Sequence, residues 1–76
     1  MRLSKKQAED ATKELLSLIA AARYGRRTSE LIGTARFHGA RTLSNRQVAR
    51  LLRATGKTRE TVDGHGMRTA TRWYIA

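Results

Sequence analysis

The chain has 76 residues, with 16 Lys and Arg against 6 Asp and Glu, for a formal net charge of +10. This length allows a single domain with a modest core, and the absence of cysteine excludes disulfides and thiolate metal sites. No stretch is apolar enough to span a membrane and no secretory signal pattern opens the sequence, so a cytoplasmic, nucleoid-associated location is expected.

The positive charge is unevenly distributed. Residues 1–24 carry five basic and three acidic side chains, whereas residues 25–76 carry eleven and three, so the two parts hold +2 and +8. Twelve of the sixteen cations are Arg, which forms forked hydrogen bonds to phosphates and to guanine edges. A field of this size attracts polyanions, and double-stranded DNA is therefore the expected partner.

A first helix is predicted from about Lys5 to Arg23, closed by Gly25. Ser4 and Gln7 have the spacing of a capping box at its start. Glu14 and the other charged residues are expected to face solvent. One apolar stripe recurs at helical spacing and predicts the buried side: Ala8, Ala11, Leu15, Leu18, Ile19 and Ala22.

A second helix is predicted to begin with Thr28 or Ser29 as its cap and to end at Gly39. Glu30 suits its positive end. Its inward side chains would be Leu31, Ile32, Ala35 and Phe37, with Arg36 and His38 outward. A helix in this place lies across a DNA backbone with its amino end toward a phosphate. Phosphate contacts are therefore expected from this part of the chain: Arg27, Thr28, Ser29, Arg36 and Arg41.

A third helix has the clearest boundaries, because Ser44 and Gln47 repeat the capping-box spacing and Gly56 supplies a left-handed stop. Its buried side would hold Val48, Leu51, Leu52 and Thr55. The other side carries the small residue Ala49 among polar side chains. The major groove of DNA admits one helix, and Arg, Asn and Gln match its base edges. DNA contacts are therefore predicted for Ser44, Asn45, Arg46, Gln47, Arg50 and Arg53.

Two strands are predicted at about 58–62 and 69–75, joined by the turn Asp63-Gly-His-Gly66. Trp73 and Ile75 would close the core. A flexible tip carrying cations can lie over a minor groove or along phosphates, so contacts are expected from four further residues: Lys57, His65, Arg68 and Arg72. In an alternative layout, residues 58–65 form a helix that presents Arg59, Glu60 and Asp63.

Two runs carry a family resemblance: Leu31-Ile-Gly-Thr-Ala-Arg-Phe37 and Asn45-Arg-Gln-Val-Ala-Arg-Leu-Leu52. Here the chain resembles winged-helix domains, in particular the gamma domain of FtsK-type and TraB-type bacterial DNA translocases. The resemblance implies that Asn45, Arg46 and Arg50 contact the bases of a short directional repeat. It does not imply a translocase activity, because the motor domains are absent from this sequence. Small winged-helix regulators of phages and plasmids are similar as well.

The expected fold is mainly α with a C-terminal β-hairpin, a winged helix-turn-helix of three helices plus wing over residues 1–76. The expected function is sequence-preferring binding to double-stranded DNA, as a homodimer or as side-by-side copies. The roles considered are a phage, plasmid or bacterial regulator, a partition factor and a DNA-processing adaptor.

No enzyme is expected, because the sequence has no paired acid and base, no activated nucleophile and no phosphate-binding glycine loop. No cofactor, metal or small-molecule ligand is expected either. Two alternatives remain open at this point: an RNA-binding winged helix, and a protein-interaction module that binds an acidic partner instead of nucleic acid.

Overall fold

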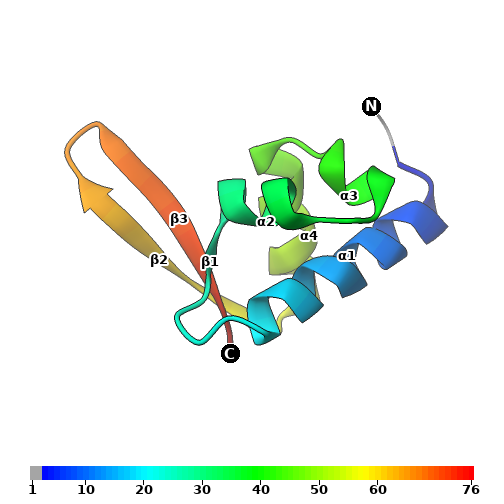
Figure 1. The fold of residues 1–76 in the computed structure, drawn as a ribbon, viewed down its shortest axis with the longest axis horizontal. Coiled ribbons are helices and arrows are strands. Elements are labelled where there is room, and N and C mark those ends of the chain that lie inside the picture. Colours follow the sequence, from blue (N-terminus) through cyan, green and yellow to red (C-terminus); the bar gives the residue numbers. More distant parts are fainter. Residues whose placement is uncertain (1–2) are drawn as a thin grey trace.

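The computed structural model describes residues 3–76, and in them four helices pack beside a three-stranded antiparallel sheet (Figure 1). The architecture is therefore mixed α/β rather than mainly α. The elements in chain order are α1 (Lys5–Ala20), β1 (Arg26–Arg27), α2 (Thr28–Thr34), α3 (His38–Arg41), α4 (Asn45–Thr55), β2 (Thr58–His65) and β3 (Arg68–Ile75).

Helix α1 begins as predicted. The Ser4 hydroxyl accepts from the backbone N–H of Gln7 at 3.1 Å, and the Gln7 side-chain oxygen accepts from the N–H of Ser4 at 2.9 Å. The helix ends earlier than predicted, at Ala20 instead of Arg23. The reason is local, because the chain tightens into a turn that closes with Gly25 in the left-handed conformation, at φ 69°.

The predicted second helix is two separate helices. Helix α2 ends at Thr34, and an extended segment leads into the short α3. In this segment the backbone N–H groups of Arg36 and Phe37 donate to the Glu14 carboxylate on α1. Glu14 was expected to face solvent, but it instead satisfies donors that a continuous helix would have used. Gly39, the predicted stop, lies buried inside α3.

The predicted cap of the second helix is also wrong. The residue before α2 is Arg27, and Thr28 and Ser29 are already helical. The Thr28 hydroxyl instead accepts from the indole N–H of Trp73 at 2.9 Å. The Glu30 carboxylate accepts from the N–H of Arg27 at 2.8 Å, so an acidic side chain does satisfy the start of this helix, as its position suggested.

The sheet has the order β1-β3-β2. Strand β2 pairs with β3 over its whole length, from Thr58 opposite Ile75 to His65 opposite Arg68. The segment predicted as the turn, residues 63–66, thus belongs mostly to β2, and the chain reverses at Gly66 and Met67. A helix over 58–65, the alternative layout, is wrong. The two-residue strand β1 was missed, since two residues are too few to show an alternating pattern.

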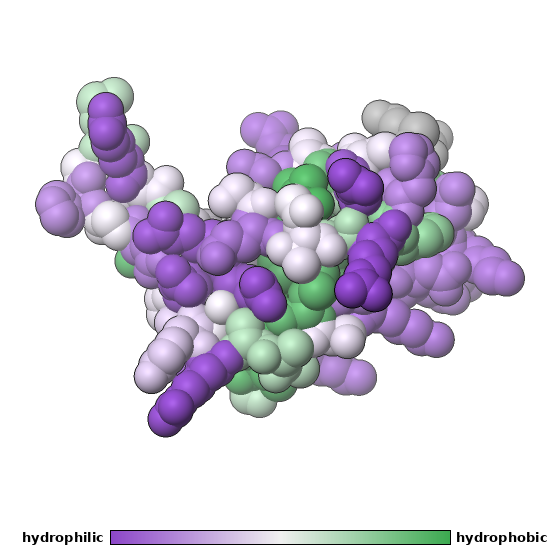
Figure 2. All heavy atoms as spheres, in the orientation of Figure 1, coloured by the Kyte–Doolittle hydropathy of each residue, from purple (hydrophilic) through white to green (hydrophobic). Residues whose placement is uncertain are grey.

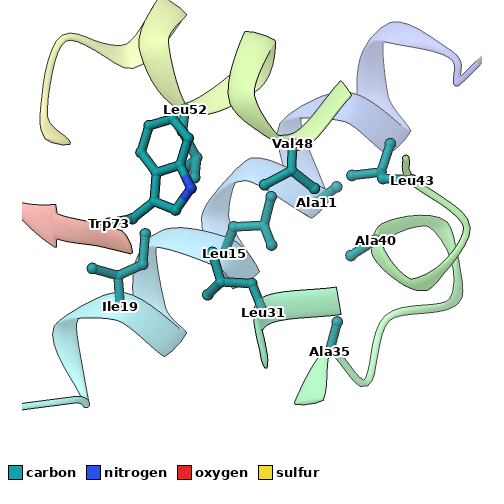
Figure 3. Close-up of a cluster of buried hydrophobic side chains, with 10 residues drawn as sticks. All are labelled: Ala11, Leu15, Ile19, Leu31, Ala35, Ala40, Leu43, Val48, Leu52 and Trp73. Carbon is teal, nitrogen blue, oxygen red and sulfur yellow. The ribbon is translucent and has the colours of Figure 1, made fainter. Parts of the chain in front are cut away.

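The core lies between the helices and the near end of the sheet, where α1, α2, α3, α4 and β3 all contribute apolar side chains (Figure 3). Trp73 is fully buried there, as predicted. Ile75 is 42% exposed, so the expectation that it closes the core is wrong. It is the last residue of β3 and stands at the edge of the packed region. The far half of the hairpin projects beyond the helices (Figure 1).

Candidate nucleic-acid interface

Helix α4 is held at both ends and along its inner side. Ser44 and Gln47 form the predicted capping box, with hydrogen bonds of 3.2 and 2.8 Å. Gly56 ends the helix at φ 66°. Val48 and Leu52 are fully buried, while Leu51 and Thr55, which were also predicted to be buried, are half-buried. The helix is therefore a fixed rod whose outer side chains project from a defined backbone.

The outer face of α4 is a basic surface with a shallow hollow of about 590 Å³. The hollow is open to solvent, and no carboxylate lines it. Ala49 forms a low point between longer side chains, as the sequence suggested. The residues around the hollow are Asn45, Arg46, Ala49, Arg50 and Arg53. Four of the predicted contact residues therefore share one surface, and Arg46 and Arg50 are exposed on it.

Arg53 differs from its neighbours because it is engaged with the sheet. Its Nε and Nη2 donate to the two carboxylate oxygens of Glu60 at 2.9 and 2.8 Å. Its guanidinium carbon also lies 5.8 Å from the centre of the Trp73 ring. The paired hydrogen bonds raise the pKa of Arg53 and lower the pKa of Glu60. This side chain braces α4 against β2, so it is less free than Arg46 or Arg50 to contact a ligand.

The two predicted contacts within the capping box are also partly committed. The Ser44 hydroxyl and the Gln47 side-chain oxygen accept backbone hydrogen bonds at the start of α4. Of the contact residues predicted on α4, Asn45, Arg46 and Arg50 thus have side chains that are not engaged within the described part of the chain. They are the three that the resemblance singled out.

Arg27 and Arg72 are joined to a carboxylate instead of projecting freely. Asp63 accepts from the Nε of Arg27 at 2.9 Å and from the Nε of Arg72 at 2.6 Å. Arg72 donates in addition to the backbone oxygen of Tyr24 at 3.0 Å, and its side chain is only 22% exposed. Because side chains alternate along β3, Arg72 lies on the sheet face opposite that of Trp73.

The hairpin tip carries a histidine and an arginine that are not paired within residues 3–76. His65 and Arg68 face each other in the register next to the turn, and both are exposed. Within the described part of the chain, neither pairs with a carboxylate. Gly64 and Gly66 have φ of 83° and 69°, which shapes the turn and places both side chains at the end of the projecting hairpin.

The remaining predicted contacts are scattered. Ser29 on α2, Arg36 before α3 and Arg41 on α3 are exposed, whereas Thr28 is bonded to Trp73. Lys57 lies on the other flank of α4, away from the arginine surface. Figure 2 shows hydrophilic side chains over most of one face of the molecule, the hairpin included.

Arg59 was missed as a candidate in the hairpin layout. Its guanidinium carbon lies 4.2 Å from the centre of the Tyr74 ring, its partner across the strands. The electrostatic attraction between a cation and the face of an aromatic ring holds the Arg59 side chain over Tyr74. Only the strand register brings these two residues together, since fifteen positions separate them in the sequence.

Among residues 3–76, no group of three His, Asp or Glu side chains is placed to hold a metal ion. No helix in the same range is both long and apolar enough to cross a membrane. Comparison with family models, curated proteins and solved structures finds no significant match for this chain.

Proposed function

We propose that the chain is a winged helix-turn-helix domain that binds double-stranded DNA with sequence preference. Helix α4 enters the major groove, and the hairpin is the wing that contacts the flanking backbone. The observation that carries the proposal is the outer face of α4, where Arg46 and Arg50 project from a capped, anchored helix beside a hollow without carboxylates. The order of three main helices followed by a hairpin supports the same assignment.

The dimensions of α4 suit this role. Eleven residues at 1.5 Å each make a rod roughly 16 Å long, and a major groove about 12 Å wide admits one helix. Ala49 allows close approach to base edges. The forks of Arg46 and Arg50 match the two acceptors of guanine, and Asn45 at the amino end matches adenine.

The hairpin supplies contacts of another kind. His65 and Arg68 at its tip reach phosphates or a minor groove, where they fix position and add affinity without reading sequence. Ser29, Arg36 and Arg41 are assigned to the backbone in the same way. Arg27, Arg53 and Arg72 are assigned to holding the sheet and α4 together, with at most a secondary contact.

One module of this size buries little DNA surface, so side-by-side copies or a homodimer on adjacent half-sites are part of the proposal. A phage, plasmid or bacterial regulator, a partition factor and a DNA-processing adaptor would each use such a module at the nucleoid.

The test is selection of bound duplexes from a random DNA pool, followed by titration of two variants. Arg50→Ala should weaken binding to the selected duplex by about 1–3 kcal/mol, or roughly 5- to 150-fold, with a much smaller loss on random DNA. Arg50→Lys keeps the charge but not the forked geometry of the guanidinium. It should therefore lose nearly as much affinity for the selected duplex and almost none for random DNA.

Three outcomes would count against the proposal. If Arg50→Ala lost the same affinity for selected and random DNA, Arg50 would not recognise a base. Preference for structured RNA over duplex DNA at matched salt would make the chain an RNA-binding protein. If the chain bound no nucleic acid at low salt, the hypothesis of a protein-interaction module would remain.

A further inference from the structure

A second hollow, of about 600 Å³, lies between α1 and α4. Its floor is mostly apolar, and it opens to solvent along its length. Leu16 and Leu51 contribute the largest side chains, and both pack against the core from its edge while remaining half-buried. The floor residues are Ala8, Thr12 and Leu16 from α1, with Leu51, Ala54 and Thr55 from α4. We call this hollow the α1–α4 groove.

The groove is separate from the arginine surface of α4. Successive residues of a helix are about 100° apart, so the Leu51 side chain leaves α4 roughly opposite to Arg46 and Arg53. Ala54 stands four residues after Arg50, so it lies at the border between the two faces. A ligand in the groove and a DNA duplex on the outer face would contact different sides of one rod. The groove is therefore not a part of the proposed DNA interface.

The rim of the groove concentrates lysines. The chain has four lysines, and three of them, Lys5, Lys13 and Lys57, line the groove together with Glu9. The rim has a charge of +2, from three lysines and one glutamate. In the part of the chain that the structure describes, none of the three lysines pairs with a carboxylate. Arginine, which dominates elsewhere in the sequence, is absent from this rim.

We propose that the α1–α4 groove binds an amphipathic segment of an acidic partner protein. Apolar side chains of the partner cover Leu16 and Leu51, and its carboxylates meet the three rim lysines. Lysine suits this task because its compact charge on a flexible stem pairs with carboxylates in many geometries. An amphipathic helix laid in an apolar groove is a common mode of peptide recognition.

Two other occupants fit the groove less well. A second copy of this chain carries the same net charge of +10, so its approach to a lysine rim is repulsive. A nucleic acid backbone would satisfy the lysines but would leave the apolar floor uncovered. Only a partner that is both apolar and acidic is complementary to the floor and the rim together.

The probe is a displayed pool of random twelve-residue peptides, selected on the intact protein at physiological salt without DNA. Selected peptides should carry apolar residues three or four apart with flanking Asp or Glu. The best peptide, synthesised and titrated into isotope-labelled protein, should shift the amide signals of Thr12, Leu16 and Ala54 and leave those of Asn45 and Arg46 in place.

Two variants of α1 make the matched comparison, because each reverses one exposed lysine. Lys13→Glu changes the charge of the rim. It should weaken binding of the peptide roughly tenfold, because one attraction is lost and one repulsion is added. Lys6→Glu changes the net charge equally, but Lys6 does not line the groove, so its effect should stay within about twofold. Neither exposed position enters the core, so both variants should keep the wild-type fold.

The proposal is overturned if the pool enriches no peptide, or if the enriched peptides lack acidic residues. Equal weakening by Lys6→Glu and Lys13→Glu would show attraction to net charge alone. Signal shifts confined to the outer face of α4 would place the peptide on the arginine surface instead.

Discussion

At the scale of residues, one carboxylate ties together three segments of the sheet. Asp63 on β2 accepts hydrogen bonds from Arg27 on β1 and from Arg72 on β3. Arg72 also reaches the backbone oxygen of Tyr24, before β1. Two arginines that their charge alone would assign to DNA thus have a structural task. The same is true of Arg53, which is paired with Glu60.

The Asp63 cluster predicts an acid-sensitive contribution to stability. Hydrogen bonds from Arg27 and then Arg72 hold the pKa of Asp63 below its ordinary value. A carboxyl whose pKa is lower in the folded than in the unfolded state stabilises the fold above the unfolded-state pKa of about 4. That contribution disappears as the pH falls through the folded-state value.

The measurement is the thermal midpoint of the wild type and of Asp63→Asn between pH 2 and pH 7. The wild type should have the higher thermal midpoint near neutral pH. The difference between the two midpoints should disappear below pH 4. Glu9→Gln, which changes an exposed carboxylate on the rim of the groove, is the control and should show little gap. A gap that does not depend on pH would mean that the ion pairs contribute nothing measurable.

At the scale of elements, two glycines with the same backbone conformation have different surroundings. Gly25 and Gly56 have φ of 69° and 66°. A Cβ at Gly25 would stand 2.3 Å from the backbone oxygen of Trp73, whereas a Cβ at Gly56 would meet nothing within 4 Å. Gly25 therefore permits the close approach of β3, and Gly56 only ends α4.

This difference predicts an order of stability. Gly56→Ala should cost about 1 kcal/mol, from the left-handed backbone alone. Gly25→Ala should cost about 2–5 kcal/mol, because a clash with a backbone atom that cannot move aside adds to the same strain. Denaturant titration of both variants measures the order, and equal costs would show that β1 and β3 separate readily in solution.

At the scale of the whole molecule, two of the surfaces that carry unpaired basic side chains are held by the fold in a fixed relation. One is the outer face of α4 and the other is the tip of the hairpin, which projects beyond the helices (Figure 1). Residues 25–76 contain three acidic side chains, and all three accept hydrogen bonds within the protein: Glu30, Glu60 and Asp63. The positive charge of these surfaces is therefore left largely uncompensated.

The proposed DNA complex predicts a steep dependence on salt. Each phosphate neutralised contributes about 0.9 to the slope of log K against log salt concentration. Arg68→Ala should reduce that slope by roughly one unit and weaken selected and random duplexes alike. Lys6→Ala, on α1, serves as the control and should leave the slope close to that of the wild type. If the slope for Arg68→Ala equalled that of the wild type, the hairpin tip would not contact the DNA backbone.

Local sequence patterns determined the elements whose signals are short in range. Both capping boxes, at Ser4 and Ser44, are present as predicted, and so is the left-handed end of α4 at Gly56. Each rests on hydrogen bonds between residues three apart, or on the backbone freedom of a single residue, and such effects act without help from the rest of the fold. The burial of Trp73 followed in the same way from alternation along one strand.

Tertiary contacts decided what the local patterns left open or misassigned. Glu14 of α1 takes the backbone donors of residues 36 and 37 and divides one predicted helix into two. Strand β1 exists only because Arg26 and Arg27 pair with β3. Contacts with Asp63 and Glu60, which lie on other elements, likewise decide that Arg27, Arg53 and Arg72 are engaged within the protein. Composition alone established how much positive charge the molecule has. Hydrogen bonds between segments determine which guanidinium groups remain free, because only the fold brings Arg53 to Glu60 and Arg27 and Arg72 to Asp63.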